Sequence, residues 1–331
     1  MRDVLGRPAS RSALVVAGLA VSALLAYLAV RGVRFHEVWS GLRRSNYWWL
    51  VPAFGALAVA NVLRAYRWQF LFAHETRPPL RPVFAAMLVG QFFNNVLPAR
   101  AGEAARIVYL KQQAGTSRAE AVGTIVLERA YDILSVLLML FVLLPWLPHV
   151  TWLRAAAILA IGLSVAMLVL FVVLERFRRR LAGLARVLSR LPFVPLERAE
   201  TAVGNLVHGL AAVRRPRLAA AALVWTTASW VVLGFSDWFL LRGFRFGLSP
   251  VAGMLVTIAI ALGMILPSSP AAVGVFEAVV LVALNAYHVP KAQGLSYAIV
   301  LHALNLFPYL AAGALILGAR VRPGRRRAVL G

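Results

Sequence analysis

Long apolar runs separated by arginine-rich segments constrain what this chain can fold into more than any other feature. The first run, residues 12–30, reaches the length of about 20 residues that an α-helix needs to cross a membrane. With 61% hydrophobic and only 14% charged residues, the composition is typical of a polytopic membrane protein. We therefore predict an all-α polytopic membrane protein with about eight transmembrane helices, at residues 12–30, 47–63, 117–144, 152–174, 218–241, 250–266, 275–287 and 295–318.

The positive charge of the chain gathers between these runs. A net charge of +23 would suggest a nucleic-acid partner in a soluble protein. In a membrane protein, however, arginine marks the cytosolic segments, and here it is concentrated before residue 12, in residues 175–217 and after residue 319. We therefore expect both termini on the cytosolic side and no nucleic acid as a partner.

The same segments divide the chain. We predict a single integral membrane domain over residues 1–331, with a first half at about 12–174, a linker at 175–217, a second half at 218–319 and a basic tail at 320–331. The linker either forms amphipathic helices on the anionic inner leaflet or is a solvated connection, and its sequence fits both. Residues 1–30 resemble a signal peptide, but no small-residue cleavage site follows the apolar run, which favours an uncleaved span.

Residues 90–132 interrupt the apolar pattern. The apolar run at 83–97 is too short for a comfortable crossing and stops at Pro98, whose ring breaks a helix. Gly102 then allows a sharp change of direction. We predict a re-entrant element that returns to the cytosolic side, because one hairpin and one crossing between residues 81 and 145 satisfy the topology.

The second half carries a similar interruption, with Pro267, Pro270 and Gly274 ahead of Glu277. Paired Pro and Gly interruptions in the two halves are typical of inverted repeats with a substrate site near the membrane midplane. A tight loop between two spans is the alternative. On the first interpretation the fold contains two re-entrant or broken helix elements, and its halves form an inverted repeat.

Ionisable residues cluster at these interruptions. Each ionised side chain costs about 3 kcal/mol in hydrocarbon, so the groups must pair at least in part. In the structural alternative, Arg106 neutralises Glu103 and Arg129 neutralises Asp132, because residues three apart lie on one helix face. A substrate site and a purely structural charge network both fit this pattern.

Motifs of soluble enzymes are absent from the sequence. It has no Cys, its six His are scattered, and no Walker A, GxGxxG or GxSxG motif occurs. We therefore predict no cofactor and no metal. Three further polar residues are expected to be structural, with Asp237 at the membrane interface and His302 and Asn305 hydrogen-bonded toward the bundle.

Three motifs are recognisable in this order: QFFNNVLPARAGEAAR at residues 91–106, LERAYD at 127–132 and LPSSPAAVGVFEA at 266–278. Together they resemble the lysylphosphatidylglycerol synthetase transmembrane family of flippase-like integral membrane proteins. The resemblance implies eight spans with re-entrant elements in a bacterial or archaeal cytoplasmic membrane, and a role in moving lipids or lipid-linked groups between leaflets. The soluble aminoacyltransferase domain of the bifunctional synthetases is not expected here, so we predict no enzyme activity.

The chain departs from the family pattern near its second interruption. Relatives usually have a glycine pair after the proline of the third motif, where this chain has Ala271 and Ala272. An arginine is common in their last span, near the position of His302. Both departures weaken the expectation of a close backbone or charge contact with a substrate there.

The resemblance and the charge pattern together predict translocation of an anionic lipid or polyprenyl-linked substrate without ATP hydrolysis. The expected partners are membrane lipids, either anionic phospholipids or lipids linked to polyprenyl phosphate. A secondary transporter of a small anionic solute and a non-transporting partner of a separate lipid-modifying enzyme are the alternatives. The candidate residues are Arg100, Arg106 and Arg129 for the phosphate, Glu103, Glu128, Asp132 and Glu277 for orientation or proton coupling, and Asn95, Pro98, Gly102, Pro267, Pro270 and Gly274 for the helix breaks.

Overall fold

A computed structural model describes residues 8–72, 76–97, 101–148, 216–266 and 268–321, together with Ile158 and Gly162. Every regular element within these residues is a helix, as the sequence predicts. The elements are α1 (Pro8–Val30), α2 (Phe35–Arg44), η1 (Tyr47–Trp49), α3 (Leu50–Phe70), α4 (Leu80–Val96), α5 (Ala101–Ala114), α6 (Arg118–Leu143), η3 (Leu144–Trp146), α10 (Pro216–Gly243), α11 (Pro250–Gly263), η5 (Pro270–Ala272), α12 (Val275–Asn285) and α13 (Lys291–Val321).

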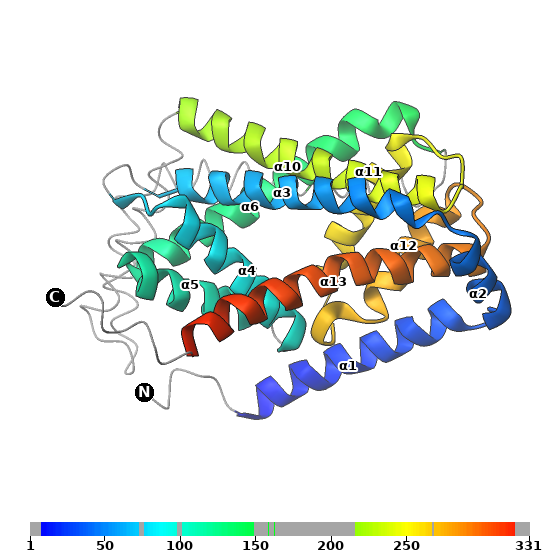
Figure 1. The fold of residues 1–331 in the computed structure, drawn as a ribbon, viewed down its shortest axis with the longest axis horizontal. Coiled ribbons are helices and arrows are strands. Elements are labelled where there is room, and N and C mark those ends of the chain that lie inside the picture. Colours follow the sequence, from blue (N-terminus) through cyan, green and yellow to red (C-terminus); the bar gives the residue numbers. More distant parts are fainter. Residues whose placement is uncertain are drawn as a thin grey trace.

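The long helices α1, α3, α10 and α13 run along the long axis of the molecule (Figure 1). α10 packs against α3 along most of its length, so the first helix of the second half lies directly on the first half. α13 packs against α4, and α1 packs against α12. The two halves of the sequence therefore interlock rather than forming separate bundles.

Three of the described helical segments are long and apolar enough to cross a membrane, namely Tyr47–Phe70, Ala219–Gly243 and Lys291–Ala319. The pair Val16–Val30 and Phe35–Arg44 would add a fourth span, although it bends by 80° at its break. The full count of eight spans remains a prediction. Its fourth span, residues 152–174, lies outside the described residues apart from Ile158 and Gly162.

Large apolar side chains point outward from the long helices. Leu24 on α1 is 58% exposed, Val224 on α10 is 65% exposed and Leu315 on α13 is 75% exposed. Exposed apolar surface on this scale marks a membrane or a partner rather than water. These positions are therefore typical of side chains that face lipid.

Two helical hairpins enter the bundle from opposite ends (Figure 1). α4 and α5 form the first hairpin, and α11 and α12 form the second, with η5 at its tip. α4 packs against η5, so the two hairpins meet inside the bundle. This opposed placement is the geometry expected of broken helices in an inverted repeat.

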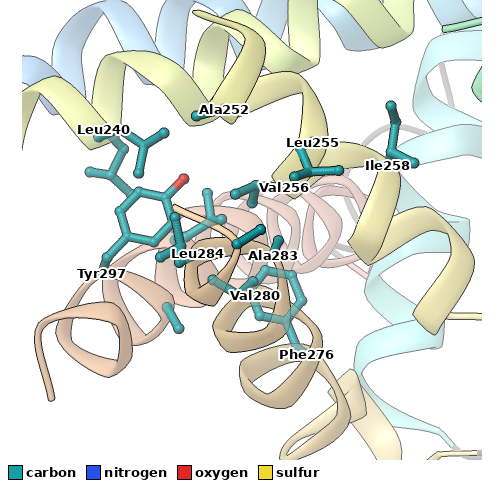
Figure 2. Close-up of a cluster of buried hydrophobic side chains, with 14 of the residues drawn as sticks. Leu240, Ala252, Leu255, Val256, Ile258, Phe276, Val280, Ala283, Leu284 and Tyr297 are labelled. Carbon is teal, nitrogen blue, oxygen red and sulfur yellow. The ribbon is translucent and has the colours of Figure 1, made fainter. Parts of the chain in front are cut away.

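Buried apolar side chains form two main clusters on either side of this meeting point. One surrounds α10, α11, α12 and α13, where Leu255, Val256, Val280 and Leu284 are at most 1% exposed (Figure 2). The other joins α3, α4, α5 and α6 around Trp68 and Leu110. In lipid such contacts stabilise helix association through close packing more than through release of water. Each hairpin is therefore packed against the long helices through its own apolar cluster.

Candidate functional site

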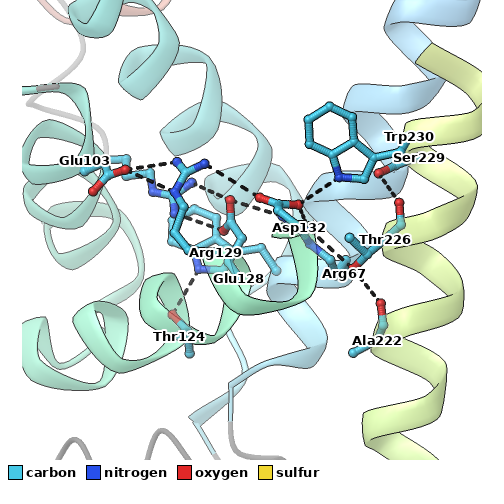
Figure 3. A network of polar contacts seen from close by, with 12 residues as sticks. Arg67, Glu103, Thr124, Glu128, Arg129, Asp132, Ala222, Thr226, Ser229 and Trp230 are labelled. Atoms are coloured by element: carbon cyan, nitrogen blue, oxygen red, sulfur yellow. Dashed lines mark hydrogen bonds and ion pairs between the residues drawn. The ribbon is translucent and has the colours of Figure 1, made fainter. Parts of the chain in front are cut away.

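Six charged side chains form a continuous network on the described helices of the first half (Figure 3). α6 presents Glu128 and Asp132 four residues apart, hence on one face of the helix. α10 covers the network from the second half with Thr226 and Trp230. The six charged members are Arg67 of α3, Glu103 and Arg106 of α5, and Glu128, Arg129 and Asp132 of α6.

Arg67 lies at the centre of the network and is 1% exposed. Its Nη1 donates to Oδ1 of Asp132 at 2.5 Å, and its Nη2 lies 3.1 Å from Oε1 of Glu128. Thr226 Oγ1 lies 3.4 Å from the same Nη1. A single guanidinium therefore ties two carboxylates of α6 to α3 and α10.

Arg106 forms the second buried ion pair. Its Nη1 and Nη2 donate to Oε1 and Oε2 of Glu128 at 3.2 and 2.9 Å, in the bidentate geometry that suits a guanidinium and a carboxylate. The guanidinium also lies 4.5 Å from the ring centroid of Trp68, whose Nε1 donates to Thr124. Arg106 is thus held on both its edge and its face.

Arg129 lies at the rim of the network, where its side chain is 45% exposed. Its Nη2 lies 3.0 Å from Oε1 of Glu103, and its Nη1 lies 3.6 Å from Oδ2 of Asp132. Trp230 Nε1 donates to the other oxygen of Asp132 at 3.2 Å. Contacts at such an exposed rim are weaker and exchange more readily than those of the buried pairs.

The network balances three guanidinium groups against three carboxylates. The pairing of Arg129 with Asp132 in the structural alternative is confirmed. The alternative pairing of Arg106 with Glu103 does not form, because Arg106 bonds Glu128 while Glu103 bonds Arg129. Pairing between packed helices has replaced pairing along one helix.

The first hairpin depends on a close approach of its two backbones. A Cβ atom on Gly102 would lie 1.9 Å from the carbonyl oxygen of Gly90, so only glycine fits there. The backbone N–H of Gly102 donates to Oδ1 of Asn94 at 2.9 Å. Asn94, rather than the predicted Asn95, therefore bridges the break. Pro98 and Arg100 lie outside the described residues.

The second hairpin restarts as α12 at a glycine with a positive φ. Gly274 has φ of 88°, and its N–H donates to Oε2 of Glu277 at 2.7 Å, which caps the helix. The other oxygen of Glu277 lies 2.5 Å from Nδ1 of His302, and Nε2 of His302 lies 2.9 Å from the carbonyl oxygen of Ala271. A carbonyl only accepts, so Nε2 carries a hydrogen. His302 therefore links the tip of this hairpin to α13.

The residues that lead into α12 adopt an unusual backbone. Ala271 and Ala272 have φ of 56° and 57°, in the left-handed region that favours glycine. They occupy the positions where the resembling family usually has a glycine pair. Pro270 begins η5 directly before them, and Pro267 lies outside the described residues.

Three other polar residues are hydrogen-bonded inside the protein. Asp237 is 2% exposed, and its Oδ2 accepts a hydrogen bond from Thr257 at 2.6 Å. His302 and Asn305 are hydrogen-bonded within the bundle as predicted. No group of three or more acidic or histidine side chains in the described part of the chain could hold a metal ion.

Sequence reasoning missed Arg67, Thr226 and Trp230. The sequence signal for Arg67 was available, because Asn61, Arg64 and Arg67 recur every three residues and so share one face of a helix. Thr226 and Trp230, in contrast, sit in an apolar span with no local pattern that marks them. Only the packing of α10 on α3 brings them to the network.

The amino-acid sequence is similar to those of known membrane proteins. A UPF0104 membrane protein of Methanocaldococcus jannaschii is 23% identical over 198 residues, which cover 60% of this chain and 81% of that protein. The family model for the transmembrane region of lysylphosphatidylglycerol synthase matches residues 15–313, which include both hairpins and the network. The chain therefore belongs to the family of the lysylphosphatidylglycerol synthase transmembrane region.

Proposed function

We propose that this protein translocates an anionic lipid, or a substrate linked to polyprenyl phosphate, between the leaflets of a bacterial or archaeal cytoplasmic membrane without ATP hydrolysis. The observation that carries the proposal is the charged network inside the helical bundle of a membrane-family chain. Ionisable groups within a membrane are costly and usually mark a substrate or ion pathway. A neutral network of arginines and carboxylates is suited to exchange one carboxylate for a phosphate.

In this proposal the two hairpins line the path of the substrate. Under it, α4–α5 and α11–α12 are re-entrant elements that line the path from the two sides and meet at η5. The N-terminus of α12 carries the positive end of its helix dipole, which Glu277 caps. Alternating access would come from movement of one hairpin and its supporting helices relative to the other.

The candidate residues take different roles in this proposal. Arg129 is the most accessible arginine of the network and would contact the phosphate by releasing Glu103. Arg106 has both terminal nitrogens on Glu128, so it would hold Glu128 and reach a phosphate only after exchanging partners. Arg100 retains its proposed role from sequence.

The carboxylates would orient these arginines. Asp132 holds Arg67 and Arg129, and Glu277 holds the restart of α12. The 2.5 Å contact between Glu277 and His302 requires one proton between the two atoms, which makes this pair the candidate for proton coupling. The chain would act as a transporter rather than an enzyme, with both termini cytosolic, and would take its lipid from a separate lipid-modifying enzyme.

The test is translocation in proteoliposomes. Purified protein is reconstituted without ATP with fluorescent phosphatidylglycerol, and a membrane-impermeant quencher measures the fraction that reaches the outer leaflet. We expect protein-dependent translocation of phosphatidylglycerol or of a polyprenyl phosphate, with a strong loss in Arg129→Gln. Arg34→Gln is the matched control, because the Arg34 side chain is 75% exposed and pairs only with Glu37 in the described contacts.

Two results would contradict the proposed function. If neither lipid moves faster than in empty liposomes, the proposed function is wrong. If an anionic solute enters the liposomes while the lipids stay in place, the protein is a solute transporter instead.

A further inference from the structure

Arg64 is an arginine without an acidic partner inside the bundle. It lies on α3, three residues before Arg67, with its side chain partly buried. The guanidinium carbon lies 4.6 Å from the ring centroid of Trp230, so one face of the group stacks on an indole. Its Nη2 is buried and has no hydrogen-bond partner.

The neighbours of Arg64 are already satisfied by one another. One turn toward the start of α3, Asn61 and the hydroxyl of Tyr309 bond each other at 3.0 Å. One turn toward the end of α3, Arg67 forms ion pairs with Asp132 and Glu128. Among the described residues, no carboxylate forms an ion pair with Arg64.

The balance of charges in the network also leaves Arg64 without an acidic partner of its own. The network of six charged groups is neutral by itself, so the positive charge of Arg64 is additional to it, attracted by Asp132 and Glu128 but paired with neither. The other buried carboxyl, Asp237 of α10, interacts electrostatically with Arg64, but it accepts a hydrogen bond from Thr257 and forms no ion pair with Arg64 in the described contacts. It therefore leaves Nη2 of Arg64 without an acceptor.

Trp230 explains how this arginine is held in place without a carboxylate. Its Nε1 donates to Asp132, which fixes the plane of the indole. The stack covers a face of the guanidinium and leaves Nη2, on its edge, without an acceptor. That edge matches two oxygens of a phosphate group.

We propose that Arg64 is the primary anion-binding residue of the site, and that it takes a phosphate group while stacked on Trp230. The neutral network then acts as the support, since Asp132 positions Trp230 and Trp230 positions Arg64. This inference rests on the proposed function for the identity of the ligand as a lipid phosphate. A free phosphate would present the same oxygens to Arg64, and the experiment separates the two sources.

The experiment measures ligand-dependent thermal stabilisation of the purified full-length chain in detergent. The probes are phosphatidylglycerol, phosphatidylcholine and inorganic phosphate, and the variants are Arg64→Gln, Arg64→Lys and the control Arg34→Gln. We expect phosphatidylglycerol to stabilise the parent and the control more than phosphatidylcholine does. We expect Arg64→Gln to weaken that binding about tenfold or more, the scale of a lost charged hydrogen bond, and Arg64→Lys to weaken it less.

The ligand-free proteins provide a second readout. Arg64→Gln leaves no carboxylate without its ion-pair partner, so without ligand its unfolding temperature should stay close to that of the parent. Arg67→Gln should unfold at a lower temperature, because it strands two carboxylates. If Arg64→Gln is destabilised like Arg67→Gln, or if it retains the parent's affinity for phosphatidylglycerol, the assignment of Arg64 is wrong.

The experiment distinguishes failure of the lipid function from failure of the Arg64 assignment. If inorganic phosphate stabilises the parent and phosphatidylglycerol does not, and Arg64→Gln abolishes that effect, then Arg64 is the anion site and the lipid function fails. If phosphatidylglycerol binds through Arg64 but is not translocated in liposomes, the binding assignment stands and the proposed transport fails.

Discussion

The ion pair between Arg106 and Glu128 makes a quantitative prediction about stability. Arg106 is 6% exposed and Glu128 is 4% exposed, and two hydrogen bonds join them. Removing one partner of a buried pair strands a charge and costs about 3–5 kcal/mol. We expect Glu128→Gln to cost more than Arg106→Gln, because Glu128 also bonds Arg67 at 3.1 Å.

The double variant should lose much less than the sum of the two single variants. Arg106→Gln with Glu128→Gln strands neither member of the pair, while Arg67 keeps Asp132. We expect a coupling energy of about 2–3 kcal/mol, near the upper end for contacting residues. The assay is thermal unfolding in detergent. At about 2 °C per kcal/mol, each single variant should lower Tm by about 6–10 °C and the coupling should recover about 4–6 °C.

A control cycle on an exposed pair sets the scale. Arg34 and Glu37 contact each other at 2.5 Å on one face of α2, but their side chains are 75% and 37% exposed. Their coupling should stay below about 1 kcal/mol, as for other surface pairs. If the Arg106 and Glu128 variants are additive to within about 0.5 kcal/mol, the two side chains are not coupled and the described network is wrong.

Three further predictions concern the rim and the two hairpins. Arg129→Gln should lower the free energy of unfolding by about 1 kcal/mol or less, because the side chain is 45% exposed; a loss as large as that of the buried pairs would contradict its place at the rim. Ala271→Gly should raise Tm, since it relieves a left-handed conformation that costs an alanine about 1–2 kcal/mol; a lower Tm would mean that the methyl group contributes packing that outweighs the strain. Gly102→Ala should prevent normal folding, measured as loss of monodisperse protein, because the new Cβ would lie 1.9 Å from a carbonyl oxygen of α4, whereas Gly55→Ala in α3, with nothing within 4 Å, should be tolerated.

The sequence predicts the places where helices break, because those depend on local chemistry. Pro98 and Gly102 predict a break between α4 and α5, although Gly102 lies inside α5, where it allows a close approach to Gly90 rather than a positive φ. The restart of α12 follows from Gly274 and Glu277. Proline removes an N–H donor and glycine permits a positive φ wherever they occur in a chain. Such effects need no knowledge of neighbouring helices.

The partners in the charge network could not be predicted in this way. The spacing of Glu103 and Arg106 favours a pair on one helix, but α5 packs against α6 so that Arg106 reaches Glu128. The extent of α3 was also underestimated, since it continues to Phe70 rather than ending near residue 63. Arg64 and Arg67 fit within this helix because they face the bundle, and only tertiary packing shows which way a helix face points.

The backbone at the tip of the second hairpin has an unfavourable conformation that contacts from other helices impose. Two consecutive alanines in the left-handed region are unfavourable by about 1–2 kcal/mol each, so surrounding contacts must impose the turn. His302 of α13 bonds the carbonyl of Ala271, and Ser22 of α1 accepts the N–H of Ser269 at 2.8 Å. α4 of the first hairpin packs against the same turn. Three helices from both ends of the chain thus converge on one strained turn, and any motion that separates the hairpins has to break contacts there.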